Sequence, residues 1–216
     1  MTLAHLGAEA YRLRLLTQLE RDLRSAGYSR IAGVDEAGRG SLAGPVVAAA
    51  VIPDPGTLIP GVDDSKRLTP AVRETLASRI RSGALAASVV VKSPALIDRI
   101  NILQATRRAM IEALAALDPA PAAAIVDAVG LGDLGFPSLP VIRGDTLSYA
   151  VACASILAKV ERDRLMRDLH RLHPVYGFDS NKGYGAPEHL EALIAYGPCP
   201  DHRLTFNSVL PTTGGI

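Results

Sequence analysis

Two kinds of apolar pattern alternate along this chain. Short apolar runs at residues 31–36, 45–52 and 87–91 are bounded by glycine, proline or polar residues, which is the pattern of β-strands. The first two runs are joined by the glycine-rich residues 38–44, whose glycines permit the backbone angles of a turn. These three runs therefore predict an antiparallel meander in the first half of the chain.

Apolar residues that recur every three to four positions predict the helices. We expect helices over residues 8–26, 70–81, 94–117, 146–172 and 187–196. The first half of the fourth helix is nearly all apolar, so it is predicted to lie at the centre of the fold. The first helix is predicted to be a packing arm, with one apolar stripe formed by Tyr11, Leu15, Leu16, Leu19 and Leu23.

Two further apolar runs, at residues 123–127 and 139–143, complete the predicted sheet. Helix-length segments rather than tight turns separate these strands, which indicates parallel pairing. The chain is thus predicted to be one α/β domain with a mixed five-stranded sheet flanked by helices. Its parts are an N-terminal arm at about 8–26, a core at about 30–172 and a small helical C-terminal appendage at about 173–216.

Composition narrows the possible functions. The 216 residues are 48% hydrophobic and 21% charged, which is ordinary for a soluble globular protein. No apolar run is long enough to cross a bilayer, and charged residues interrupt the N-terminal region, so a cytoplasmic protein is expected. A formal net charge of +1 excludes a generally basic nucleic-acid coat and leaves room only for a local basic patch. A monomer is the default expectation.

The cysteines and histidines show no pattern of a disulfide framework or a zinc site. Cys153 lies in an apolar helical stretch and Cys199 lies between two prolines, so both are expected to be reduced thiols. Three C-terminal histidines lack the spacing of zinc ligands and are expected at the surface: His173, His189 and His202.

Acidic residues occur where the predicted strands end. Asp35 and Glu36 close the first strand, Asp127 closes the fourth, and Asp145 follows the fifth. Strand ends converge on one crevice in such sheets, and carboxylates are suitable ligands for a hard divalent cation. For Asp35 and Glu36 alone, a solvated hairpin with incidental acids is an equally good interpretation. Four strand-end acids favour the metal site.

Five segments, in this order, resemble the motifs of bacterial ribonuclease HII: GVDEAGRGSLAGPVVAAAVI, DDSKRL, the acid after AAIV, RGDTLSYAVACASILAKVERD and YGFDSNKGYG. The resemblance covers about residues 31–209. It implies a ribonuclease H-like fold and an endoribonuclease that hydrolyses the RNA strand of RNA/DNA hybrids. It also implies cleavage 5′ of single ribonucleotides embedded in duplex DNA, leaving a 5′-phosphate and a 3′-hydroxyl.

The resemblance implies catalytic and metal-binding roles for four acids: Asp35, Glu36, Asp127 and Asp145. Phosphodiester hydrolysis needs an activated water, neutralised charge and a stabilised leaving oxygen, and two metal ions can serve all three needs. We therefore expect magnesium or manganese, with two ions when substrate is bound.

The resemblance also implies substrate contacts. The glycine-rich residues Gly38, Arg39 and Gly40 match positions that contact the ribonucleotide, and Tyr184 matches the position that contacts the sugar beyond it. Lys66 and Lys182 fall within family motifs and are expected to contact phosphate, although each fits a surface lysine equally well. The chain departs from the common pattern at two places, which puts only fine substrate contacts in doubt: Asn181, and Ala186 with Pro187.

Two alternative functions belong to other classes. GRGSLAG could cradle the phosphate of a nucleotide, but the lysine followed by Ser or Thr that such a loop needs is missing, and a strand follows the glycines. A protein that binds hybrids without cutting them is expected to have lost at least one of the four acids. None is lost, so cleavage is the better interpretation.

Overall fold

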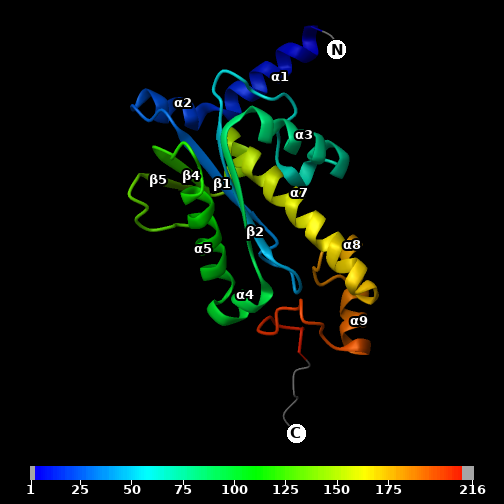
Figure 1. Ribbon diagram of the computed structural model, residues 1–216. Coiled ribbons are helices and arrows are strands. Elements are labelled where there is room, and N and C mark those ends of the chain that lie inside the picture. The colour runs from blue at the N-terminus through cyan, green and yellow to red at the C-terminus, as the bar shows by residue number, and fades with distance from the viewer. Residues whose placement is uncertain (1–2, 211–216) are drawn as a thin grey trace.

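Five strands form one mixed sheet in the order β3-β2-β1-β4-β5 (Figure 1). The computed structural model describes residues 3–210, so the last six residues of the predicted appendage lie outside the described part. β1 pairs antiparallel with β2, and β2 with β3, whereas β4 is parallel to both β1 and β5. The predicted antiparallel meander with parallel additions is therefore confirmed. The strands are β1 Ile31–Ala37, β2 Val46–Pro53, β3 Ala84–Lys92, β4 Ala123–Asp127 and β5 Ser138–Val141.

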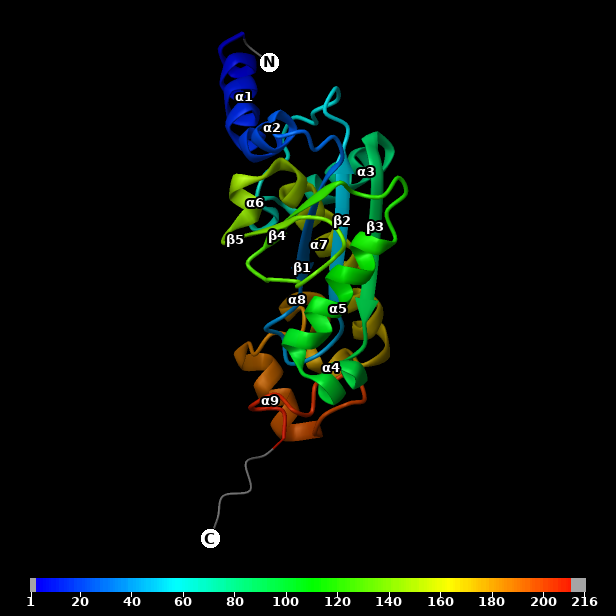
Figure 2. The same cartoon turned by 90° about the vertical axis from the view of Figure 1, so that its left-hand side faces the viewer.

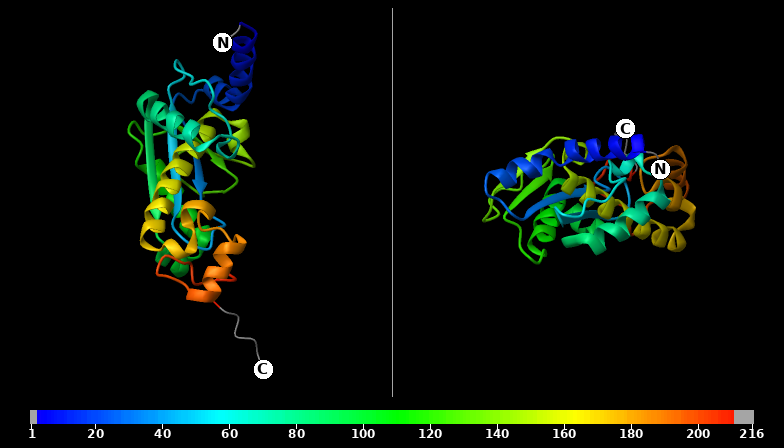
Figure 3. Two further views of the ribbon diagram at one scale, coloured as in Figure 1. Left: turned by 90° about the vertical axis from the view of Figure 1, so that its right-hand side faces the viewer. Right: turned by 90° about the horizontal axis from the view of Figure 1, so that it is seen from above.

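Helices cover both faces of this sheet. The central helix α7 and helix α3 lie on one face (Figure 3), and α5 lies on the other (Figure 2). The helices are α1 Leu3–Leu16, α2 Gln18–Ser25, α3 Pro70–Gly83, α4 Pro94–Ile100, α5 Ile102–Ala115, α6 Gly144–Leu147, α7 Tyr149–Leu172, α8 Phe178–Asn181 and α9 Pro187–Tyr196.

Strand β2 is apolar throughout because both of its faces are buried. Val47, Ala49 and Val51 face the α7 side, while Ala48 and Ala50 face the α5 side. A strand that is covered on both faces reads as a continuous apolar run, which is why residues 45–52 show no polar alternation.

A glycine in β1 sets the close approach of α7 to the sheet. A Cβ atom on Gly33 would lie 2.1 Å from the carbonyl carbon of Ala150, so any larger residue would push the helix away. Tyr149 to Ala158 of α7 are buried, as their apolar sequence predicted. This contact brings one side of α7 over the strand that carries Asp35.

The predicted arm helix is two helices, and its predicted stripe is partly wrong. The helix is interrupted at Thr17, whose hydroxyl donates to the carbonyl of Leu13. Leu13 and Leu16 are buried, whereas Tyr11 and Leu15 are exposed. The reason is visible in Figure 2, where only the end of α1 meets the body while the rest projects beyond it.

Short capping interactions divide two other predicted helices. The helix expected over residues 94–117 breaks at Asn101, which has a φ of 64° and whose side chain accepts a hydrogen bond from the amide of Gln104. The central helix is preceded by the short α6 and begins after Ser148. Glu20 of α2 accepts hydrogen bonds from the hydroxyl of Ser148 and from an amide at the start of α7, which fastens the arm to the core.

The C-terminal segment after α7 packs with Ala43 and with Met166 of α7 into a small apolar cluster at the opposite end of the molecule from α1 (Figure 1). Both cysteines are free thiols, which confirms the prediction of no disulfide. Among the helices described here, none is long and apolar enough to cross a membrane.

Candidate active site

The register of two parallel strands brings two acids together. β1 and β4 pair Val34 with Val126, so the next residues, Asp35 and Asp127, lie side by side on one face of the sheet. Residues two positions earlier on each strand line the face that packs against Val151 of α7. The predicted convergence of these strand ends is therefore present in the structure.

Glu36 completes a group of three carboxylates. One oxygen from each of Asp35, Glu36 and Asp127 lies within 4.8 Å of the others. Burial, followed by the charges of Glu36 and Asp127, raises the pKa of Asp35 well above its ordinary value. Burial, followed by the charge of Asp127, raises the pKa of Glu36 to about 7. The three carboxylates therefore favour the binding of a positive charge between them.

The donor set fits a divalent cation. The Oε2 atom of Glu36 is buried without a hydrogen-bond partner in the described part of the chain, and carboxylate oxygens are the ligands that such a cation prefers. Asp127 is held in place because its Oδ1 accepts a hydrogen bond of 2.7 Å from the amide of Gly144. A bound cation would satisfy the orphaned oxygen and relieve the repulsion among the acids.

Asp145 lies next to this group rather than within it. Its Oδ2 is 3.6 Å from the ammonium nitrogen of Lys66, and its side chain is nearly buried. Burial and then the charge of Asp64 raise its pKa. The structure thus brings three of the four predicted acids within reach of one ion, and it pairs the fourth with a lysine that was itself predicted to be a phosphate contact.

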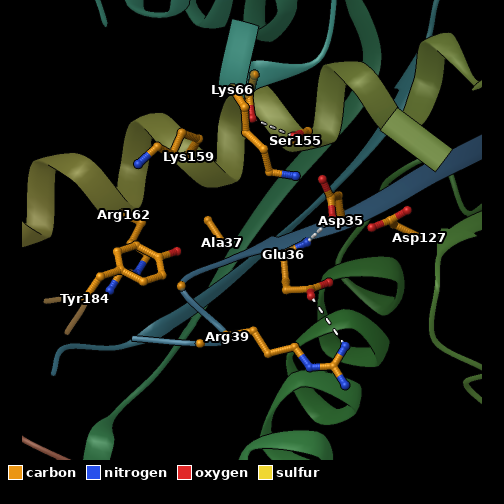
Figure 4. Close-up of a pocket in the computed structure, with 13 residues that line it drawn as sticks. Asp35, Glu36, Ala37, Arg39, Lys66, Asp127, Ser155, Lys159, Arg162 and Tyr184 are labelled. Atoms are coloured by element: carbon orange, nitrogen blue, oxygen red, sulfur yellow. Dashed lines mark hydrogen bonds and ion pairs between the residues drawn. The ribbon is translucent and has the colours of Figure 1, made fainter. Parts of the chain in front are cut away.

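A cleft of about 400 Å³ joins the acids to the glycine-rich loop (Figure 4). In Figure 4, Lys66 extends toward Asp35 from one side, while Tyr184 lies at the far end of the cleft from the acids. The residues that line the cleft are Asp35, Glu36, Ala37, Gly38, Arg39, Gly40, Ser65, Lys66, Asp127, Ser155, Lys159, Arg162 and Tyr184. All the predicted substrate-contacting residues except Lys182 belong to this set.

Helix α7 contributes three polar residues that the sequence interpretation missed. Ser155, Lys159 and Arg162 are spaced four and three positions apart, so they project from one side of the helix into the cleft. Ser155 also hydrogen-bonds to Ser65 across 2.9 Å. The available signal was this polar periodicity within a helix whose first half is otherwise apolar.

Two buried arginines hold the glycine-rich loop by its backbone. Arg203 donates to the carbonyls of Gly38 at 2.7 Å, Arg39 at 2.9 Å and Gly44 at 3.0 Å. Arg162 donates to the carbonyl of Pro45 at 3.1 Å and to the hydroxyl of Ser41 at 2.7 Å. Neither arginine was singled out from the sequence, because the contacts join positions more than a hundred residues apart.

Gly38 and Gly40 of the glycine-rich loop differ in the space that is available for a Cβ atom. Gly38 has a φ of 89°, and a Cβ there would lie 1.8 Å from Nε of Arg162. Among the residues that the structure describes, and apart from its two chain neighbours, none has an atom within 4 Å of the place a Cβ on Gly40 would occupy. The fold therefore demands glycine at position 38, whereas position 40 is open toward solvent in the free protein.

Tyr184 is tied to the same arginine. The guanidinium carbon of Arg162 lies 5.5 Å from the centre of the Tyr184 ring, and Arg162 also donates to the carbonyl of Lys182 at 2.9 Å. The side chain of Lys182 turns to the carbonyl of Asp179 instead. Its role as a phosphate contact stays a prediction.

Two of the three C-terminal histidines were wrongly predicted to lie at the surface. His189 and His202 are almost fully buried, and only His173 is partly exposed. Tyr176 and Phe178 pack around the two buried rings. These aromatic contacts are not visible from local spacing, because Tyr176 and Phe178 precede α9, whereas His202 follows it.

A second group of potential ligands lies near these histidines and is already paired. His173 Nε2 is 3.3 Å from Asp201 Oδ2, and Cys199 Sγ is 3.2 Å from Nδ1 of His202. Burial raises the pKa of the Cys199 thiol, which disfavours the thiolate that a metal would need. The prediction that these histidines do not form a zinc site is compatible with this geometry.

Comparison with known proteins agrees with the fold. The family model for ribonuclease HII matches residues 32–209. A ribonuclease HII of Ruminiclostridium cellulolyticum is 49% identical over 92% of this chain and 78% of its own length, and one of Pelobacter propionicus is 52% identical over 88% and 87%. The crystal structure of ribonuclease H2 from Pyrococcus horikoshii superposes with a TM-score of 0.74 at 29% identity, covering 84% of this chain and 95% of that one. Matches of this extent show that the chain belongs to the ribonuclease HII family.

Proposed function

We propose that this ribonuclease H enzyme hydrolyses the RNA strand of RNA/DNA hybrids and cuts 5′ of single ribonucleotides within duplex DNA. The observation that carries the proposal is one cleft in which Asp35, Glu36 and Asp127 stand beside the glycine-rich loop. The acids supply a site for hydrolysis, and the loop offers backbone groups for recognition. Cleavage leaves a 5′-phosphate and a 3′-hydroxyl.

The acids would hold magnesium or manganese, with two ions when substrate is bound. Asp35, Glu36 and Asp127 would bind directly, and Asp145 would join once Lys66 turns from it to a phosphate. The bound ions would neutralise the carboxylates, activate a water and stabilise the leaving oxygen. The chain's own part is to hold the carboxylates in register through β1 and β4 and to orient Asp127 through Gly144.

Discrimination of RNA from DNA would depend on the backbone of the loop. The 2′-hydroxyl is the chemical difference at a single nucleotide, and it can both donate and accept a hydrogen bond. The open space at Gly40 lets a nucleotide approach the main chain, while Arg203 and Arg162 fix the loop from behind. Tyr184 would then hold the neighbouring sugar and favour deoxyribose on the 3′ side.

Other features of the proposal concern the whole chain. We propose that the chain acts as a monomer and as a single catalytic domain. Its partners would be hybrid duplexes and ribonucleotide-containing DNA, and its location would be the cytoplasm. The intact set of acids weighs against a protein that binds hybrids without cutting them.

Three otherwise identical labelled duplexes test the proposal. One carries a single ribonucleotide, one a 2′-O-methyl nucleotide at that position and one only DNA, and each is incubated with the protein and magnesium or manganese. We expect cutting of the first alone, with discrimination on the order of 10⁴-fold, because the site's polar groups are left unpaired by the other two. Equal cutting of all three, or no cutting with either metal, would contradict the proposal.

A further inference from the structure

Two buried histidines form a hydrogen-bonded chain behind the cleft. The Nε2 atoms of His189 and His202 are 3.0 Å apart. At one end, Nδ1 of His189 is 2.8 Å from the carbonyl oxygen of Tyr184. At the other, Nδ1 of His202 accepts from the amide of Cys199 at 3.0 Å and also lies 3.3 Å from the carbonyl oxygen and 3.2 Å from Sγ of that residue. The pair therefore connects the C-terminal segment to a residue that lines the cleft.

The carbonyl of Tyr184 sets the direction of this chain. A carbonyl can only accept, so Nδ1 of His189 carries a proton, and Nε2 of a neutral His189 accepts from Nε2 of His202. The unprotonated Nδ1 of a neutral His202 then accepts from the amide of Cys199, the shortest of its contacts with that residue. The two Nε2 atoms are then a matched donor and acceptor. Protonating His189 would set the two Nε2 donors against each other, and protonating His202 would set its Nδ1 against the amide of Cys199, so the geometry favours two neutral imidazoles.

The surroundings favour this neutral state. Tyr176 and Phe178 enclose both rings, and burial lowers the pKa of each histidine, that of His202 to about 4. The pair is therefore a fixed polar connection within an apolar cluster, unlike an exposed histidine that changes charge near neutral pH.

Contacts from several elements fix the position of Tyr184. Gly183 just before it accepts hydrogen bonds from the amides of Leu42 and Ala43, which belong to the glycine-rich loop. The ring of Tyr184 rests against Arg162. The residue is thus held on one side by the loop and the arginine, and on the other by His189 and by the amide of Ala186, which donates to the same carbonyl at 2.8 Å.

We propose that the His189–His202 pair is a positioning element that fixes Tyr184 at the sugar-binding end of the cleft. The proposal rests on the proposed function, in which Tyr184 contacts the sugar next to the ribonucleotide. Neither histidine lines the cleft, so both act through Tyr184 and neither is a catalytic residue. Losing the bond to the Tyr184 carbonyl lets the ring move and weakens the hold on that sugar.

Two substitutions at one position separate positioning from general stability. His189→Asn places an amide nitrogen near the position of Nδ1, so it keeps a donor for Tyr184 but loses His202. His189→Gln reaches the position of Nε2, so it keeps His202 but loses Tyr184. We expect His189→Gln to lower kcat/KM about fivefold on a duplex with one ribonucleotide, and His189→Asn to stay within about twofold of the wild type.

A double variant tests whether His189 acts on cleavage through Tyr184. In Tyr184→Ala protein, which has no ring to position, His189→Gln should cause no further loss. Equal losses in the two His189 variants, or an undiminished loss in the Tyr184→Ala background, would overturn the proposal. Thermal unfolding of all variants separates these effects from a loss of folded protein.

Imidazole ¹⁵N NMR of the wild-type protein gives a readout that needs no variant to fold. At neutral pH we expect His189 as the Nδ1–H tautomer and His202 as the Nε2–H tautomer, both uncharged. The same tautomer in both rings, or a charged ring, would overturn the proposal. Failure of the wild type to cut the ribonucleotide duplex would instead refute the proposed function, and the tautomers would still be measurable.

Discussion

The acid group should make the metal-free protein less stable as the pH rises. Burial and neighbouring charge raise the folded-state pKa of Glu36 from 4.5 to about 7. A raised pKa means that this group's contribution to stability is fully present below pH 4.5 and is lost as the pH passes through about 7. Because one pKa unit corresponds to about 1.4 kcal/mol, ionising Glu36 in the metal-free fold costs about 3 kcal/mol.

Glu36→Gln removes this ionisation while keeping the shape of the side chain. In the presence of a chelator at pH 8.5, the variant should exceed the wild type in free energy of unfolding by about 3 kcal/mol, which is roughly 6–12 °C in Tm for a chain of this size. At pH 5 the two proteins should agree within about 1 kcal/mol. Urea unfolding at several pH values measures both quantities.

A matched control and a metal arm complete the experiment. Glu191→Gln changes an exposed glutamate on α9 and should leave the pH dependence of the wild type unchanged. Adding magnesium at pH 8.5 should stabilise the wild type and have less effect on Glu36→Gln. If the wild type is equally stable at pH 5 and pH 8.5 without metal, the electrostatic account of the acid group is wrong.

Three further predictions follow from the cleft. Asp127→Asn should lower cleavage by on the order of 10³-fold in a gel assay while leaving circular dichroism unchanged, because it removes the negative charge of a proposed metal ligand; near wild-type cutting would remove it from the site. Gly38→Ala should lower the free energy of unfolding by about 2 kcal/mol because its Cβ displaces Arg162, whereas Gly40→Val should retain stability within about 0.5 kcal/mol and lose cleavage; equal Tm losses would refute this difference. Lys66→Ala should reduce the salt dependence of duplex binding by about one unit of slope, and an unchanged slope would mean that it contacts no phosphate.

The positions of the acids could be predicted because strand pairing follows simple rules. Asp35 and Asp127 follow the paired residues Val34 and Val126 of two neighbouring parallel strands, so their convergence follows from the apolar runs that precede them. Strand β1 continues to Ala37, two residues beyond Asp35. The antiparallel meander with parallel additions follows from the same runs and from the lengths of the segments between them, whereas the order of the strands in the sheet was not predicted. These features depend on the order of apolar and polar residues along short segments, which can be read from a single sequence.

The surroundings of the acids could not be predicted in this way. Arg203 holds the glycine-rich loop from a point more than 160 residues later, and His202 lies behind α9 within an aromatic cluster. Nothing in the spacing of these residues indicates what covers them. The arm helix was misjudged for a related reason, because an apolar stripe such as Tyr11 and Leu15 shows what a helix could bury, not how much of it meets the core.

Two buried arginines connect the C-terminal appendage to the site. Arg203 belongs to the appendage and bonds to the glycine-rich loop, and Arg162 of α7 bonds to the carbonyl of Lys182 in the appendage. Within residues 3–210, no carboxylate lies within ion-pairing distance of Arg162 or Arg203; their partners are mainly backbone carbonyls, with one serine hydroxyl. Burial and the charge of Arg162 lower the pKa of Arg203 to about 9, so it is still charged at neutral pH.

An arginine paired with a carboxylate would have little net charge, whereas one bound to carbonyls keeps its full charge. Two such charges beneath the glycine-rich loop oppose the repulsion that the acids exert on an approaching phosphate, and low-dielectric surroundings strengthen the effect. The same guanidinium groups that shape the loop therefore also prepare the cleft electrostatically for a polyanion, which explains how a chain with a net charge of only +1 can hold nucleic acid beside three carboxylates.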